Sequence, residues 1–537
     1  MKKQPAVKWL IQNNRNLRWP IVLLSFIGLV LSLTAIFFAY FSKETIDSAI
    51  LGDDSRFVKY AIVISLIMLV NLVFTILNSY YKVYYKSLTE KRLKKQIFNK
   101  IIKAKPKHTS NVHSGVFMTH LESDIELIAD GLTEVVPRTI FYIFRFLGAF
   151  ILLFILDQLF AVMFLALGFT LFLASRLIAK PMKKRHHILQ TNQEYARSYM
   201  QEGIENITVI KSFEAEDKIG KNQDDKQQNV FKAKLRKNNL TLLASGGLNL
   251  FFAFGYAFAI IFGAYRLQDG LTVGSLLAMI QLVQHIQSPF SGLSQLIPKY
   301  HQMIASTERL IVLDQFQDEI KNQTFKTNEF TQIEIRDLSF SYGSKSIFDH
   351  FNLKVSKGDM IHLNGESGKG KTTLIKLLLG LVEPKQGSIE ISSNKQKIKI
   401  SNETRCFFSY VPQENLMMSG TIRDNLNLFA DHPDEALYQA LRIAALDEEV
   451  HQLPFGLDTI LGEKGYGLSE GQIQRLAIAR ALSKDAPILL LDEITSSVDK
   501  ATELKIMESI KSLTDKTCFI VSHRPLSNDL VTLSIDI

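Results

Sequence analysis

Long apolar runs in the N-terminal half constrain the fold of this chain more than any other feature. A helix needs about 20 consecutive apolar residues to cross the hydrocarbon core of a bilayer. Runs of about that length occupy residues 20–41, 58–80, 135–156, 158–178, 243–265 and 271–297. The first is too long for a signal-peptide core and lacks a convincing cleavage site, so we expect it to be retained. The sequence predicts six membrane spans, and a tight hairpin at Asp157 and Gln158 joins the third to the fourth.

The distribution of charge predicts which ends of the spans face the cytoplasm. Residues 1–19 contain basic side chains and no acidic one, and the segments at about 82–134 and 179–240 are also basic. Lys and Arg gather on the cytoplasmic side of membrane proteins. We therefore expect a cytoplasmic N-terminus and two long cytoplasmic excursions, in which helical periodicity extends the spans. Because this topology explains most of the net charge of +9, no nucleic-acid partner is expected.

Polar side chains lie within two of the predicted spans. Gln281, Gln284, His285 and Ser288 follow one another at steps of three and four in the last span. Arg145 lies in the middle of the third span, where a charge costs about 2.5–3.5 kcal/mol on insertion scales. These residues either line a water-filled path for a substrate or hydrogen-bond to neighbouring helices. We favour the substrate cavity for the stripe, and both interpretations stay open for Arg145.

The C-terminal half changes to short apolar strands, glycines and helical segments, which indicates an α/β domain. Its clearest motif is GESGKGKTT, between the strand-like MIHLN and the helical LIKLLLGL. In such a loop the backbone N–H groups surround the phosphates of a nucleotide. Lys371 would bridge the β- and γ-phosphates, and the Thr372 hydroxyl would coordinate Mg²⁺. The expected ATP-binding residues of this loop are Gly365, Glu366, Ser367, Gly368, Lys369, Gly370, Lys371, Thr372 and Thr373.

Two consecutive acids end a second apolar strand, ILLLDE. Asp492 is placed to hold Mg²⁺ through water, and Glu493 to polarise an attacking water as a general base. A third strand, FIVSH, is followed by His523, whose imidazole could contact the γ-phosphate. The sequence therefore predicts an ATPase site with Mg²⁺ as its cofactor.

In this order the motifs resemble an ATP-binding cassette domain, and the whole chain resembles a half-transporter of the ABC exporter family. The segment FSYGSKSIF contains Tyr342, which resembles the aromatic residue that stacks on adenine. The segment YVPQENLMMSGTIRDNL contains Gln413, which resembles the residue that reaches towards Mg²⁺ and the membrane domain. LSEGQ resembles the family signature, and SSVD resembles the loop that crosses to the partner. The resemblance implies that Ser469, Gly471, Gln472 and Asp499 belong to the nucleotide sites.

The membrane half shows the same resemblance. SGVFMTHLESDIELI and QEGIENITVIKSFEAED resemble the segments of the two coupling helices, near 114–130 and 200–217, and ASTERL resembles the lead-in to the nucleotide domain. The expected fold is an all-α polytopic transmembrane domain, with six helices extended into the cytoplasm, followed by an α/β P-loop ATPase domain of ABC type. The expected parts are a cytoplasmic segment 1–19, a membrane domain 20–310, a linker 311–331 and a nucleotide-binding domain 332–537 with an abbreviated C-terminus.

The resemblance implies a dimer of half-transporters in the cytoplasmic membrane, with the ATPase domain inside the cell. ATP binding and hydrolysis would drive export, or lipid flipping, of an amphiphilic substrate by alternating access. The alternative functions are an ATP-gated channel or regulatory subunit, and the catalytic half of a heterodimeric exporter. The transported small molecule, lipid or peptide is not identified by the sequence.

One residue departs from the family pattern, because Glu470 stands in the middle of LSEGQ. The same letters predict a capping box, with Ser469 as N-cap and Gln472 three residues later. Glu470 would then occupy the first helical turn, where the helix dipole favours an acid. Since a signature serves the partner's ATP, a weakened signature beside an intact Glu493 is compatible with a heterodimer. A homodimer is still favoured.

Overall fold

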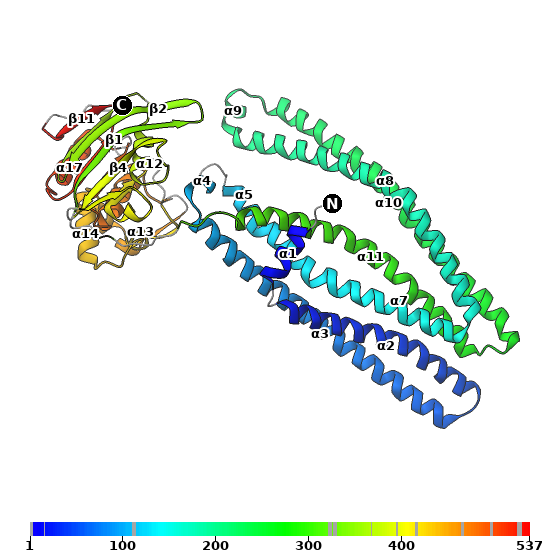
Figure 1. Cartoon of the computed structure of the whole chain (residues 1–537). Coiled ribbons are helices and arrows are strands. Elements are labelled where there is room, and N and C mark those ends of the chain that lie inside the picture. The colour runs from blue at the N-terminus through cyan, green and yellow to red at the C-terminus, as the bar shows by residue number, and fades with distance from the viewer. Residues whose placement is uncertain are drawn as a thin grey trace. The chain divides into compact units, whose positions relative to one another are not determined.

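The computed structural model divides into two units, each compact by its own contacts (Figure 1). Unit 1 comprises Met1–Phe98 and Ser114–Gln315, and unit 2 comprises Asn99–His113 and Phe316–Ile537. The structure describes residues 4–14, 17–109, 114–319, 325, 330–366, 368–393, 396–413, 417–462, 465, 467–493, 498–522 and 529–537, with backbone alone for 4, 167–180 and 248.

Unit 1 is helical throughout its described residues. Its elements are α1 (Gln4–Asn13), α2 (Arg18–Ile50), α3 (Asp54–Lys103, whose last turns enter unit 2), α5 (Ser114–Thr119), η2 (His120–Asp124), α6 (Ile125–Asp130), η3 (Gly131–Val135), α7 (Val136–Leu156), α8 (Gln158–Glu205), α9 (Ile207–Ser212), α10 (Glu216–Arg266), η4 (Leu267–Asp269) and α11 (Val273–Asp314). The helical membrane domain is therefore confirmed.

Four helical stretches of the described chain are long and apolar enough to cross a membrane: Arg18–Ile50, Asp54–Lys103, Ser114–Leu156 and Glu216–Asp269. They contain the first, second, third and fifth expected spans. The fourth expected span falls within α8, and all but the first two residues of the sixth fall within α11. Their passage through the membrane stays a prediction.

The expected hairpin between the third and fourth spans is present. α7 ends at Leu156 and α8 begins at Gln158, so only Asp157 separates them. Asp157 is the N-cap of α8, and its Oδ1 accepts a hydrogen bond from the Phe160 N–H at 2.9 Å. Its Oδ2 accepts another from Arg266 Nε at 3.0 Å. A single capping residue thus turns the chain and also ties the start of α8 to the end of α10.

The first predicted excursion is helical over most of its described residues, as the periodicity predicted. From α5 to α7 the chain forms one run of helix that includes two π-helical segments, η2 and η3. Ile125, Ile128 and Leu132 are buried, and α6 packs against α11. In the second excursion, Asn206 separates α8 from α9, and Ile204 and Ile207 are exposed in this unit.

Unit 2 contains two main sheets. The antiparallel sheet has the order β2-β1-β4-β5, and the parallel sheet has the order β11-β3-β10-β9-β6. Their strands are β1 (Phe330–Tyr342), β2 (Lys345–Ser356), β3 (Met360–Asn364), β4 (Gln386–Ser393), β5 (Gln396–Lys399), β6 (Phe408–Val411), β9 (Ile488–Asp492), β10 (Thr517–Val521) and β11 (Leu533–Asp536), and β7 (Gly420–Thr421) pairs with β8 (Ile460–Leu461). The helices are α4 (Pro106–Thr109), α12 (Lys371–Leu378), α13 (Ile422–Leu426), α14 (Asp434–Ile443), α15 (Asp447–Gln452), α16 (Glu470–Ser483) and α17 (Lys500–Lys511), with short 3₁₀ turns at Glu403–Phe407 and Gly456–Asp458.

The alternation of β9 explains how the parallel sheet is covered on both faces. Successive side chains of a strand point to opposite faces. Ile488 and Leu490 join a buried cluster with α12 and the antiparallel sheet, whereas Leu489 and Leu491 join a second cluster with α14, α16 and α17. The strand is apolar on both faces, as in a buried parallel sheet. Its carboxyl end therefore emerges beside the start of α12, where the phosphate-binding loop lies.

Candidate nucleotide-binding site

The phosphate-binding loop joins the buried strand β3 to α12, which is the strand–loop–helix arrangement that the motif requires. Gly365, Gly368 and Gly370 have φ values of +139°, +81° and +126°. Residues with a Cβ rarely adopt such angles, so glycine is needed for the loop to wrap. At Gly370, the N-cap of α12, an added Cβ would also lie 2.6 Å from Ile347 Cγ2. Both the backbone angle and the local packing therefore require a glycine there.

Lys371 and Thr372, which the sequence predicted to contact phosphate and metal, are the first two residues of α12. The Lys371 side chain is buried, and its Nζ donates to the Gly365 carbonyl at 2.6 Å. The Thr372 hydroxyl donates to Asp492 Oδ1 at 3.4 Å. The two motifs that are 120 positions apart in sequence thus meet at one edge of the sheet.

Asp492 is fully buried at the end of β9. Burial raises the pKa of its carboxyl, and the nearby charge of Glu493 adds to the effect, while the hydroxyls of Thr372 and Tyr410 oppose it. The Tyr410 hydroxyl donates to Oδ2 at 3.5 Å. Within the described residues no Lys or Arg forms an ion pair with Asp492. A buried carboxylate beside a threonine hydroxyl suits Mg²⁺, which prefers hard oxygen ligands.

Glu493 leaves the strand in a left-handed conformation, with φ at +54°. This conformation is unfavourable for a residue with a side chain. Its N–H donates to the Val521 carbonyl of β10 at 3.0 Å, and Gln413 Nε2 donates to its Oε2 at 2.6 Å. The structure therefore brings together Glu493 and Gln413, two of the three residues in the predicted catalytic set. The third, His523, lies outside the described residues, as does Ser367 of the loop.

The predicted capping box is present at the start of α16. The Gln472 N–H donates to Ser469 Oγ at 3.2 Å, and the Ser469 N–H donates to Gln472 Oε1 at 2.7 Å. Glu470 is the first residue of the helix and is exposed, and Gly471 follows it. The confirmed cap orients the signature, and the extra acid is accommodated at the helix N-terminus.

Glu449 of α15 also contacts the beginning of α16, and the sequence did not predict this contact. It accepts from Gln472 Nε2 at 2.6 Å and from Arg475 Nη1 at 2.6 Å. Burial works to raise the pKa of Glu449, but the hydrogen bonds from Arg475 and Gln472 hold it below its usual range. No local motif identifies this partner, because it lies 23 positions before Gln472.

All but Thr373 of the remaining predicted nucleotide contacts that the structure describes are surface residues. Tyr342 ends β1, is 48% exposed, and stands edge-on to the Phe340 ring with centroids 4.9 Å apart. Asp499 caps α17 and accepts from the N–H groups of Ala501 and Thr502 at 3.0 Å. In the loop, Glu366 and Lys369 are exposed, and Thr373 is buried.

In the membrane unit, the expected polar stripe separates into two groups. Arg145 Nη2 lies 2.8 Å from His285 Nδ1, and the side chains of Gln281 and Ser288 are partly buried. Gln284 is exposed in this unit. Arg145 of α7 thus contacts a side chain of α11. The sequence alone left open whether Arg145 contacts a neighbouring helix or lines a path for substrate.

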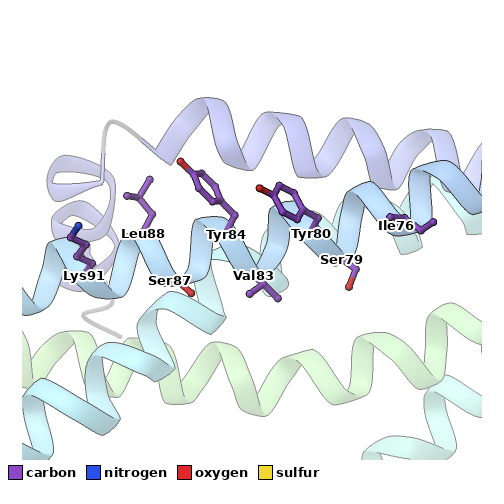
Figure 2. Close-up of a pocket in the computed structure, with 8 residues that line it drawn as sticks. All are labelled: Ile76, Ser79, Tyr80, Val83, Tyr84, Ser87, Leu88 and Lys91. Carbon is purple, nitrogen blue, oxygen red and sulfur yellow. The ribbon is translucent and has the colours of Figure 1, made fainter.

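An open groove lies along α3, apart from the residues of the nucleotide-binding site (Figure 2). It has a volume of about 810 Å³ and is lined by residues of that single helix, among them Ile76, Tyr80, Tyr84 and Leu88. No residue of the nucleotide site lines it. We therefore do not assign catalytic chemistry to this groove.

The fold and the site define a helical membrane domain fused to a P-loop ATPase domain. Residues 21–290 match the ABC transporter transmembrane region, and residues 348–496 match the ABC transporter family. The chain belongs to the ABC transporter family. It is a multi-pass membrane protein that binds ATP and is an ATPase coupled to transport.

Named relatives are similar over most of the chain. An ATP-dependent lipid A-core flippase of Desulfotalea psychrophila is 29% identical over 427 residues, which are 77% of this chain and 73% of that protein. An ATP-dependent lipid A-core flippase of Legionella pneumophila strain Paris is 28% identical over 521 residues, which are 94% and 87% of the two chains. The structure of a bacterial Atm1-family ABC exporter with ATP bound aligns with a TM-score of 0.78 and 21% identity, covering 95% of this chain and 92% of that one. This last similarity concerns the fold alone.

Proposed function

We propose that this chain is one half of an ATP-driven exporter or flippase for amphiphilic molecules, and that it works as a dimer. The observation that carries the proposal is the Gln413–Glu493 hydrogen bond of 2.6 Å beside the phosphate-binding loop, in a chain that also contains the membrane domain. Similarity to two lipid A-core flippases supports a lipid-like substrate. A homodimer is favoured, and a heterodimer stays open.

The site residues have distinct parts in this proposal. The loop N–H groups and Lys371 would bind the phosphates, and Glu493 would accept a proton from the attacking water. Thr372, Asp492 and Gln413 would hold Mg²⁺, which would neutralise phosphate charge when bound. The signature, through Ser469 and Gly471, would close on the ATP of the partner chain. Closing and reopening of the ATPase pair would then alternate the access of the cavity.

The test is the ATPase rate of the full chain reconstituted in lipid. Glu493→Gln keeps the size of the side chain and its hydrogen bonding to Gln413 but removes the base, so we expect at least a hundredfold lower rate. Glu383→Gln, at an exposed position after α12, is the matched control and should leave the rate unchanged. An equal rate in Glu493→Gln and wild type would overturn the assignment of Glu493 and favour an ATP-gated channel or regulatory subunit.

A further inference from the structure

Arg145 carries a positive charge inside the membrane unit with a neutral partner. A guanidinium can only donate, so its Nη2 donates to His285 Nδ1 at 2.8 Å. A ring nitrogen that accepts a hydrogen bond carries no proton, and the N–H is then on the other ring nitrogen. His285 is therefore neutral, and its Nδ1 accepts the hydrogen bond from Arg145. Among the described side chains, no carboxylate pairs with Arg145.

Several polar atoms around this pair have no hydrogen-bond partner within the described part of the chain. They are Arg145 Nε, Gln281 Oε1 and Ser288 Oγ, and all three atoms are buried. Gln281, His285 and Ser288 lie four and three residues apart on α11, so they share one face of that helix. Buried polar groups are normally satisfied, and intramembrane charges are retained mainly where they act. The arrangement offers a cation and a hydroxyl donor to a group that can accept from both.

A second cationic cluster lies two helical turns before Arg145. Glu134 is 4% exposed and pairs with Lys82 Nζ at 3.1 Å, Arg138 Nη1 at 2.5 Å and Lys299 Nζ at 2.8 Å. Three cations thus surround one carboxylate, and Arg138 and Lys299 are about half exposed. Arg138 and Arg145 are seven residues apart, so they lie on the same side of α7 and roughly 10 Å apart along its axis. The two clusters form a basic track along α7 and α11.

We propose that this track recognises the acidic headgroup of an amphiphile, a phosphate or a carboxylate, with Arg145 as the binding residue at membrane depth. The cluster around Glu134 supplies the first contact, because its excess positive charge lies at the expected cytoplasmic end of the span. Arg145 Nε and Ser288 Oγ then donate to the headgroup oxygens, which satisfies atoms that otherwise have no partner. The inference rests on the proposed export function and adds the substrate class to it.

The experiment is a binding titration of the full-length protein in neutral detergent, without nucleotide, read by native mass spectrometry. The probes are dodecyl phosphate, zwitterionic dodecylphosphocholine and inorganic phosphate. We expect wild type to bind dodecyl phosphate at least roughly tenfold more tightly than dodecylphosphocholine, and inorganic phosphate only weakly, since charge-assisted hydrogen bonds distinguish the headgroups. Arg145→Gln should remove that preference, and Arg145→Lys should keep part of it.

Two further variants keep the test decisive if Arg145→Gln does not fold. Ser288→Ala should weaken dodecyl phosphate binding several-fold, and Lys299→Gln should weaken it as well, whereas Arg56→Gln on an exposed turn should not. Equal affinities for the two detergents in wild type, or an unchanged preference in Arg145→Gln, would overturn the proposal. If inorganic phosphate bound as tightly as dodecyl phosphate, the site would be one for a free anion. That result would overturn the proposal that the ligand is an amphiphile. Because no ATP is present, these outcomes are independent of the Glu493→Gln result.

Discussion

Asp124 and Arg309 lie 185 positions apart and form an ion pair, in which Arg309 Nε donates to Asp124 Oδ2 at 2.9 Å. Asp124 is 2% exposed, and it also accepts from Ser306 Oγ at 2.8 Å and contacts His120 Nδ1 at 2.7 Å. The segment that resembles a coupling region is thus joined directly to the ASTERL segment at the end of α11. Removal of the Arg309 charge would leave the buried Asp124 carboxylate without this cation, whereas the Arg309 side chain itself is about half exposed.

We predict that Asp124→Asn lowers the free energy of unfolding of the full chain by about 1.5–3 kcal/mol, the range for hydrogen bonds to charged groups. Thermal unfolding in detergent measures it. Glu122→Gln is the matched control, because Glu122 is 62% exposed and pairs with Lys94 on the surface. That control should change stability by less than about 1 kcal/mol. Equal effects of the two substitutions would contradict the assigned role of Asp124.

The glycines of the phosphate-binding loop provide a second matched pair. Gly370→Ala should abolish ATP binding or weaken it at least tenfold, because an added Cβ meets the side chains of Ile347 and Phe348. Gly368→Ala also has a positive φ but meets nothing within 4 Å, so it should show backbone strain of about 1 kcal/mol alone. Measurements of ATP affinity and thermal stability for both variants distinguish a steric clash of the new Cβ from backbone strain alone. A weaker effect at Gly370 than at Gly368 would argue against this account.

Glu449 predicts a pH dependence of stability. Its folded pKa lies below its unfolded value because of Arg475 and Gln472, so its stabilising contribution is present above the unfolded pKa of about 4.3. The contribution is lost as the pH falls through the folded pKa. Glu449→Gln should therefore be less stable than wild type near pH 7, by under about 1 kcal/mol because the side chain is 39% exposed. The stabilities of the two proteins should converge once the pH falls below the folded pKa of Glu449, and a difference that grew with acid would exclude this pairing.

Glu470→Gly separates the two kinds of dimer. Glu470 is exposed in the first turn of α16, and its loss should cost no more than about 1 kcal/mol of helix stability. In a homodimer, the ATPase rate should be kept or raised through both sites. In a heterodimer, the change should fall mainly on nucleotide occupancy of the non-catalytic site. ATPase rates of the purified chain alone and with a co-expressed second half-transporter distinguish these results.

Prediction from the sequence succeeded where the chemistry is local. The capping box at Ser469 and the hairpin at Asp157 depend on residues within three positions of one another, and both are present. The spacing of Gln281, Gln284 and His285 could not show which of them the neighbouring helices cover, because that depends on the packing of α7. The contacts of Asp124 with Arg309 and of Glu449 with Gln472 were also missed, since they join positions 185 and 23 residues apart and no local pattern pairs them.

The hydrogen bond from the Glu493 N–H to the Val521 carbonyl has a consequence for how this site tolerates mutation. Main-chain groups define both the left-handed angle at Glu493 and its anchor on β10, so most side-chain substitutions in the neighbourhood leave them in place. Only proline at position 493 removes the donor outright. The proposed role of Glu493 as a base would therefore be lost on a single conservative replacement, such as Glu493→Gln, while the backbone geometry stays the same. A chain that had changed from pump to gate would keep the same backbone turn.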